Sequence, residues 1–132
     1  MARGRMVTAA GTTWPARYTF SPALLAGRLL FIAGTTATDD TGQLVAPGDI
    51  VGQTRYIYAK FAALLAAAGG GLEHIVETTE YITTTEDYRG TADVRRAVFT
   101  PPYPAATGVI VAGLLRPGAL IEISAVAVLP EP

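Results

Sequence analysis

The sequence predicts a single α+β domain in which a mixed β-sheet carries two helices on one face. The chain has 132 residues, the length of one compact domain. Half of its residues are hydrophobic and only 16% are charged, which excludes a disordered segment. Apolar stretches with strand character alternate with two segments of helical spacing, in the order β-β-α-β-α-β-β. Residues 1–132 form the one domain, and we assign no element to residues 1–16.

The N-terminal half is expected to hold two strands and the longer helix. Residues 17–26 form the first strand, and the apolar run at 28–33 forms a second strand that is buried on both faces. Clusters of Gly and Asp then indicate turns. A helix begins after the N-cap Asp49 and ends at Gly69. Its apolar stripe consists of Ile57, Phe61, Leu64, Leu65 and Ala68.

The C-terminal half is expected to hold three strands and the second helix. Residues 72–83 are rich in β-branched and aromatic side chains, which favours a strand. A capping box at Thr84 begins a helix that runs to about Phe99. The last two strands cover residues 105–114 and 120–129.

Two helices cannot cover both faces of this sheet. The strands at 28–34, 106–113 and 120–129 are nevertheless apolar on both sides of the pleat. A second covering surface is therefore needed, and another copy of the chain is the simplest source. We expect a homo-oligomer.

The composition excludes several classes of protein. The chain has no cysteine and a single histidine, His74, which excludes disulfides, a thiolate nucleophile and a multi-histidine metal site. Ten basic and eleven acidic residues give a net charge of −1, which disfavours nucleic-acid binding. No apolar stretch has the length of a membrane span or the position of a signal-peptide core. We expect a cytoplasmic protein without nucleic-acid or membrane partners.

Six short segments occur in an order and spacing that point to one family. They are Phe20-Ser21-Pro22-Ala23, Phe31-Ile32-Ala33-Gly34, Val76-Glu77-Thr78-Thr79-Glu80-Tyr81-Ile82, Asp87-Tyr88, Pro104-Ala105 and Ile121-Glu122-Ile123-Ser124-Ala125-Val126-Ala127. Each segment alone is weak evidence, but the ordered set spans residues 17–129. On this resemblance the chain is identified as a member of the Rid family of reactive-intermediate deaminases, also called YjgF-like.

The resemblance implies a homotrimer whose three sheets enclose a central barrel, with ligand clefts between neighbouring subunits. It also implies hydrolysis of a reactive enamine or imine, such as 2-aminoacrylate, to a keto acid and ammonia, without a metal or an organic cofactor. In typical members an arginine pairs with the substrate carboxylate, and that position is Ala106 here. The family's helix asparagine falls at Ala92 and its early tyrosine at Phe20. The chain is therefore a divergent member, and the standard amino-acid imines are doubtful substrates.

Glu122 and Gly34 match the family's water-placing glutamate and strand-end glycine, and we predict that they are catalytic. Glu122 interrupts an apolar strand, where desolvation should raise the pKa of its carboxyl and suit it to acid–base work on a water. The alternative is a structural glutamate at a sheet edge or barrel mouth, paired with an arginine or a water. The Gly34 backbone would hold the reacting water.

The predicted substrate-binding residues are Phe20, Thr35, Tyr88, Arg95, Ala106, Thr107 and Gly108. Phe20 and Tyr88 would form aromatic walls, or pack in the core instead. The small side chains at 106–108 would enlarge the pocket and make it less attractive to anions. Arg95 or its neighbour Arg96 could supply a relocated cation to an anionic ligand; alternatively, the arginine packs its stem and extends its head into solvent. Glu80 could line the cleft or the trimer axis, or be solvated at a subunit rim.

The leading functional interpretation is a Rid-like hydrolase or deaminase that adds water to an enamine, imine or similar activated double bond. Its substrate would be a non-standard small molecule, such as a 2-aminomuconate-type compound or an intermediate of specialised metabolism. The alternative is a non-catalytic trimer that binds a small metabolite, which the missing arginine favours. Glu122 favours the enzyme, because desolvating a carboxylate is costly without a role. A ribonuclease is the weakest interpretation, because the charge is balanced.

Overall fold

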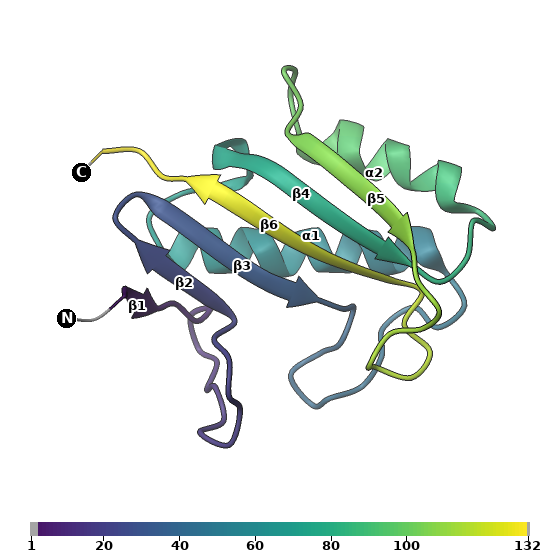
Figure 1. Ribbon diagram of the computed structural model, residues 1–132, viewed down its shortest axis with the longest axis horizontal. Helices are drawn as coiled ribbons and strands as arrows, with labels where there is room; N and C mark the ends of the chain where they lie inside the picture. The colour runs from purple at the N-terminus through teal and green to yellow at the C-terminus, as the bar shows by residue number, and fades with distance from the viewer. Residues whose placement is uncertain (1–2, 132) are drawn as a thin grey trace.

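A computed structural model describes residues 3–131 and shows an α+β fold, with a six-stranded mixed sheet in front of its helices in the view of Figure 1. The strand order is β1-β2-β3-β6-β4-β5, and only the pair β4–β5 is parallel. The strands are β1 (Arg5–Met6), β2 (Ala23–Ala26), β3 (Leu29–Thr35), β4 (Ile75–Ile82), β5 (Ala105–Ile110) and β6 (Ile121–Val128). The helices are α1 (Ile50–Ala67) and α2 (Thr91–Val98), with 3-10 turns at Leu72–His74 and Tyr88–Gly90. The predicted fold class is confirmed, and the short strand β1 was not predicted.

Helix α1 forms the main cover of the inner face of the sheet. Asp49 caps it by accepting a hydrogen bond from the backbone N–H of Gly52 at 2.9 Å, as predicted. The side chains of Ile57, Phe61 and Leu65 are fully buried against the sheet. They meet inward-facing residues of the central strands, mainly Leu30, Ile32, Ile121, Ile123 and Ala127. The core therefore lies between the helices and the inner face. None of the helices in the described part of the chain is long and apolar enough to cross a membrane.

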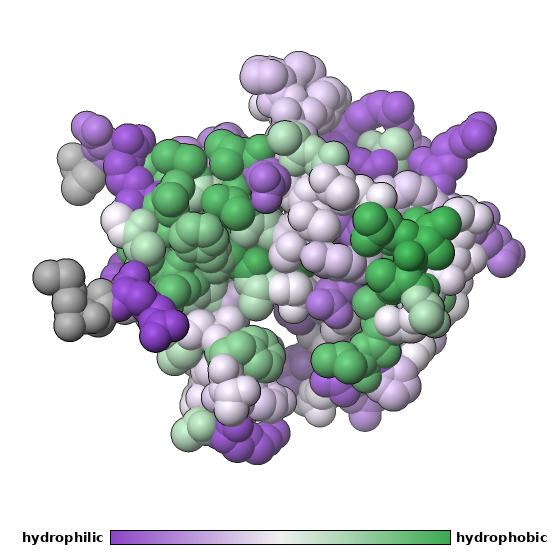
Figure 2. Space-filling model, in the orientation of Figure 1, coloured by the Kyte–Doolittle hydropathy of each residue, from purple (hydrophilic) through white to green (hydrophobic). Residues whose placement is uncertain are grey.

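The outer face of the sheet carries exposed apolar side chains. Leu29 and Phe31 of β3 are 40% and 44% exposed, and their neighbours in register on β6 are Val128 and Val126. Figure 2 shows the resulting apolar patch on the left of this face and a second one on the right. Further exposed apolar side chains are Val109 and Ile110 at the end of β5 and Leu115 in the loop that follows it. Both helices lie on the inner side, so within one chain the outer face has no cover, and burial of these strands on both faces by a second copy stays a prediction.

Four predicted element boundaries are wrong. Strand β4 begins at Ile75 rather than at residue 72, because a 3-10 turn occupies Leu72–His74, and strand β5 ends at Ile110 rather than at residue 114. The first strand begins at Ala23 rather than at residue 17, because the aromatic side chains before it pack on one another instead of pairing in the sheet. Trp14 lies edge-on to Phe20, and its indole N–H donates to the Phe20 carbonyl at 2.8 Å. The second helix begins at Thr91 rather than after Thr84, because Asp87 adopts a left-handed conformation with φ of 59°.

Candidate functional site

Glu122 and Gly34 face each other on the outer side of the sheet. Glu122 lies on β6 between two buried isoleucines, so the pleat turns its side chain outward. Gly34 lies near the end of β3, and a Cβ at this position would overlap Oε2 of Glu122. A side chain at this position would displace the carboxylate from the place it occupies beside Gly34. On β4, the strand that flanks β6 on the side away from β3, Tyr81 pairs in register with Glu122.

The surroundings of Glu122 explain why the pKa of its carboxyl is raised. Strand β6 is central rather than at an edge, so the alternative of an edge glutamate is wrong. Within residues 3–131 no side chain forms a hydrogen bond or ion pair with the Glu122 carboxyl. Burial raises the pKa of this carboxyl above its usual value of 4.5, as predicted. A partly desolvated carboxylate without a cationic partner is suited to accept and return a proton.

A second group of predicted residues lies on the inner side of the sheet, between α2 and the edge strand β5. Ala106 and Gly108 of β5 pair in register with Thr78 and Glu80 of β4. Thr78 and Glu80 are 2% and 3% exposed, which shows that this side of the pleat faces the helices. Tyr88 lies against Gly108, where a Cβ would stand 3.5 Å from the tyrosine oxygen.

Glu80 is the centre of a buried polar cluster. Its Oε1 accepts a short hydrogen bond from the Tyr88 hydroxyl, and its Oε2 accepts one from Nη1 of Arg95 at 3.2 Å. The same Nη1 donates to Oγ1 of Thr91 at 2.8 Å. Desolvation, followed by the hydrogen bond to Glu80, raises the pKa of Tyr88 to about 12. Tyr58 is also buried nearby, and its hydroxyl has no hydrogen-bond partner within the described residues.

This cluster corrects two expectations. Glu80 is not solvated at a rim, because its side chain is buried and ion-paired with Arg95. Arg95 does not extend its head into solvent either, because its guanidinium turns inward to Glu80 and its side chain is only 24% exposed. Arg95 is therefore a cation whose charge is already balanced. Arg96 is an exposed residue that pairs with Asp93 at 2.9 Å.

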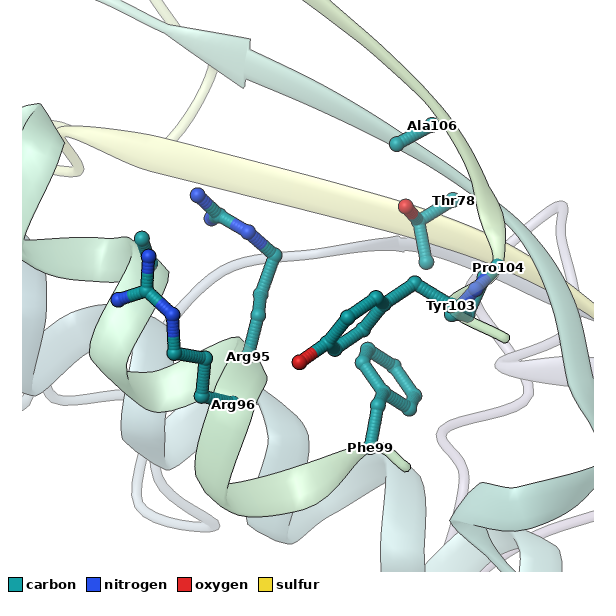
Figure 3. A pocket seen from close by; sticks show the side chains of 8 residues that line it. Thr78, Arg95, Arg96, Phe99, Tyr103, Pro104 and Ala106 are labelled. Carbon is teal, nitrogen blue, oxygen red and sulfur yellow. The ribbon is translucent and has the colours of Figure 1, made fainter. Parts of the chain in front are cut away.

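A cavity of about 230 Å³ opens beside the cluster. Figure 3 shows Arg95 and Arg96 of α2 along one side of it, with Thr78 and Ala106 of the sheet on the opposite side. Tyr103 reaches between them. The lining residues are Thr78, Ala92, Arg95, Arg96, Phe99, Tyr103, Pro104 and Ala106. Apart from the two arginines, Thr78 and the Tyr103 hydroxyl, this lining is apolar or aromatic.

The remaining predicted residues lie elsewhere. Thr35 donates its hydroxyl to the Ala33 carbonyl at 2.7 Å, near Gly34. Thr107 follows Ala106 on the opposite, outer side of the pleat. Phe20 is 55% exposed within the aromatic group of Trp14 and Tyr18. The predicted site residues therefore divide between two faces of the sheet, and one chain does not bring them together.

Sequence reasoning did not find the partnership of Glu80 with Arg95. The signal was present, because Thr78 and Ile82 flank Glu80 at the period of a strand and indicate the same face. Among residues 3–131, no three His, Cys, Asp or Glu side chains are grouped so that they could hold a metal ion.

Comparison with known proteins gives consistent matches over nearly the whole chain. A family model described as Endoribonuclease L-PSP matches residues 9–129. A RutC family protein from Pyrococcus horikoshii is 38% identical over 109 residues, covering 82% of this chain and 85% of that protein. A protein of unknown function from Pseudomonas aeruginosa superposes with a TM-score of 0.85 at 31% identity, covering 98% of this chain and 94% of that one. RidA from an Antarctic Psychrobacter superposes with a TM-score of 0.82 at 27% identity, covering 95% of this chain and 100% of that one.

Proposed function

The chain belongs to the Endoribonuclease L-PSP family, to which the RutC and Rid proteins also belong, and from this premise we propose that it is a hydrolase or deaminase. It adds water to an enamine, imine or similar activated double bond of a non-standard small substrate. One observation carries the proposal: the partly buried Glu122 carboxyl lies against Gly34, where no side chain can intervene. The resemblance to the Rid family assigns a water to this place.

The chemistry needs one group that accepts a proton and returns it. An enamine first becomes an iminium ion by taking up a proton from solvent at carbon. Water then adds its oxygen to the iminium carbon while it gives a proton to the Glu122 carboxylate. Protonated Glu122 returns this proton to the nitrogen, the C–N bond breaks, and ammonia takes up the hydroxyl proton as the carbonyl forms. A raised pKa of Glu122 brings its acid and base forms closer to equal population near neutral pH.

The complete site requires a second copy of the chain. Glu122 and Gly34 lie on the outer face, whereas Arg95, Ala106 and the cavity lie on the inner side. A small substrate cannot touch both groups through one sheet. The apolar outer face also needs a cover, since Leu29 and Phe31 are exposed on it. We therefore propose a homotrimer with clefts between subunits, and sedimentation should give three times the 13.8 kDa chain mass.

The test is release of ammonia and carbonyl product from freshly generated imines and enamines, including 2-aminoacrylate and aminomuconate analogues. Glu122→Gln should abolish turnover, because the amide cannot accept the proton. Glu77→Gln is the matched control: it removes an exposed carboxylate from the outer side of the neighbouring strand and should leave turnover unchanged. Equal turnover of the wild-type and Glu122→Gln proteins would overturn the assignment of Glu122.

The second candidate function is a metabolite-binding trimer without turnover. The alanine at position 106, where the family places its arginine, favours it. Saturable binding of a small molecule in a protein that converts none of the panel would support it over the enzyme. The name of the matching family suggests RNA cleavage, which a net charge of −1 disfavours. Incubation with single-stranded RNA at low salt tests that activity directly.

A further inference from the structure

The ion pair between Glu80 and Arg95 changes what the inner cavity can recognise. We propose that this cavity binds the uncharged polar group of a ligand, such as a carboxamide or carbonyl on an aromatic or apolar body, and discriminates against a carboxylate. The inference rests on the proposed function in one respect, because it names the substrate class of that same site. The binding itself is independent of turnover.

The first step of the argument is electrostatic. Glu80 is 3% exposed and lies 3.2 Å from Nη1 of Arg95, so its negative charge is poorly screened by water. A carboxylate that approaches Arg95 is attracted by the guanidinium and repelled by Glu80 at nearly the same place. A neutral group experiences no such repulsion and still meets a strong donor.

The second step concerns the N–H groups of Arg95 that form no hydrogen bond within the described residues. A guanidinium carries five N–H groups in a fixed plane. Within the described residues, both hydrogen bonds of Arg95 leave from Nη1, toward Glu80 and Thr91. Nε and Nη2 form no hydrogen bond within those residues and are left to donate to a ligand, and the side chain, which lines the cavity, is 24% exposed. A carbonyl oxygen is the acceptor that suits them.

The third step concerns the body of the ligand. Phe99 and Tyr103 form an aromatic side of the cavity, which Figure 3 shows next to Arg95. Ala92 and Ala106 contribute only methyl groups. The volume of about 230 Å³ lies below the roughly 300–1,000 Å³ of pockets for drug-sized ligands, which suits a single ring. An aromatic or compact apolar body with one carbonyl group fits this lining.

Benzamide and benzoate are the test probes, because they share size and shape and differ in charge. Their dissociation constants are measured by NMR titration of the labelled protein. Wild-type protein should bind benzamide more tightly by about tenfold. Glu80→Gln keeps an acceptor for the Tyr88 hydroxyl but removes the negative charge, so it should reverse the preference toward benzoate. Glu131→Gln is the matched control: it removes an exposed carboxylate that pairs with Arg28, a residue outside the cavity lining, and should leave the ratio unchanged.

The double variant Glu80→Gln/Arg95→Met removes both charges without leaving either one buried alone, and circular dichroism checks its fold. It should lose the wild-type preference for benzamide. Equal or tighter binding of benzoate by wild-type protein, no binding of either probe, or an unchanged ratio in Glu80→Gln would overturn the proposal. These outcomes are distinct from failure of the proposed function, because a ratio of dissociation constants does not depend on whether Glu122→Gln abolishes turnover.

Discussion

Replacing Arg95 by alanine should strongly destabilise the protein, because it leaves the Glu80 carboxylate buried without its cation. The Coulomb energy of two unit charges 3.2 Å apart is about 5 kcal/mol at an effective dielectric constant of ~20. The partial exposure of Arg95 reduces this value, and breaking a buried ion pair typically costs about 3–5 kcal/mol. We therefore expect Arg95→Ala to lower the free energy of unfolding by about 3 kcal/mol.

The assay is urea unfolding followed by circular dichroism, at one fixed chain concentration because association in the proposed trimer would contribute to stability. With a slope of about 1.5 kcal/mol per molar urea, the midpoint should fall by about 2 M. Arg96→Ala is the control, since Arg96 pairs with Asp93 at the surface on the same helix. Exposed pairs of this spacing contribute about 0.5 kcal/mol or less, so its midpoint should move by less than about 0.4 M.

A second variant separates the lost ion pair from the lost arginine side chain. Glu80→Gln/Arg95→Met leaves no buried charge and keeps a side chain of similar length at position 95. Replacing a buried ion pair by neutral groups is often close to neutral in stability, so the double variant should recover most of the loss. A loss below about 1 kcal/mol in Arg95→Ala, or a double variant no more stable than the single one, would refute the reasoning.

Four further predictions follow from the site. Glu122→Gln should raise the melting temperature by roughly 2 °C at pH 7, because burial raises the pKa of Glu122 and the ionised carboxylate therefore destabilises the folded state. In thermal scans this gain should vanish below about pH 4, where the wild-type carboxyl is protonated. Gly34→Ala should cut turnover by about tenfold or more with an unchanged dichroism spectrum, since its Cβ would displace the Glu122 carboxylate. Phe31→Glu should dissociate the proposed trimer in sedimentation experiments by placing a charge on the apolar outer face. Ala106→Arg should tighten benzoate binding in an NMR titration by about tenfold, because it adds an uncompensated cation to the cavity.

Most of the fold could be predicted from local patterns. Helix α1 combines an N-cap at Asp49, a continuous apolar stripe and a glycine stop, and each feature indicates the same element. The last strand was predicted within one residue at each end, since its inward positions are all apolar. The strand expected from residue 17 was wrong for a tertiary reason. Its aromatic residues have high strand propensity, but Trp14 and Phe20 contact each other instead.

The sequence indicated individual candidate residues of the site, but not how they are arranged on the two faces of the sheet. The position of Glu122 within an apolar strand indicated a partly buried carboxyl, and the raised pKa confirms that part of the expectation. Which face of the sheet each residue occupies depends on pairing between strands far apart in the chain. Ala106, for example, faces inward because it pairs with Thr78, and no local pattern in β5 reveals this. For Glu80 the strand spacing indicated the face but not the partner, because Arg95 lies 15 positions away on a different element.

The charges on the two faces lead to one conclusion about the substrate. On the outer face, Glu122 has no cationic partner among residues 3–131, so an anionic group near it would meet only repulsion. On the inner side, the cavity is lined by two cations, Arg95 and Arg96, but each is already paired with a carboxylate, Arg95 with Glu80 and Arg96 with Asp93. A cleft assembled from these two halves would attract a substrate carboxylate at neither end. The alanine at position 106 and the glutamate at position 80 are therefore consistent with each other, because both remove net positive charge from the place where an arginine would hold an anion.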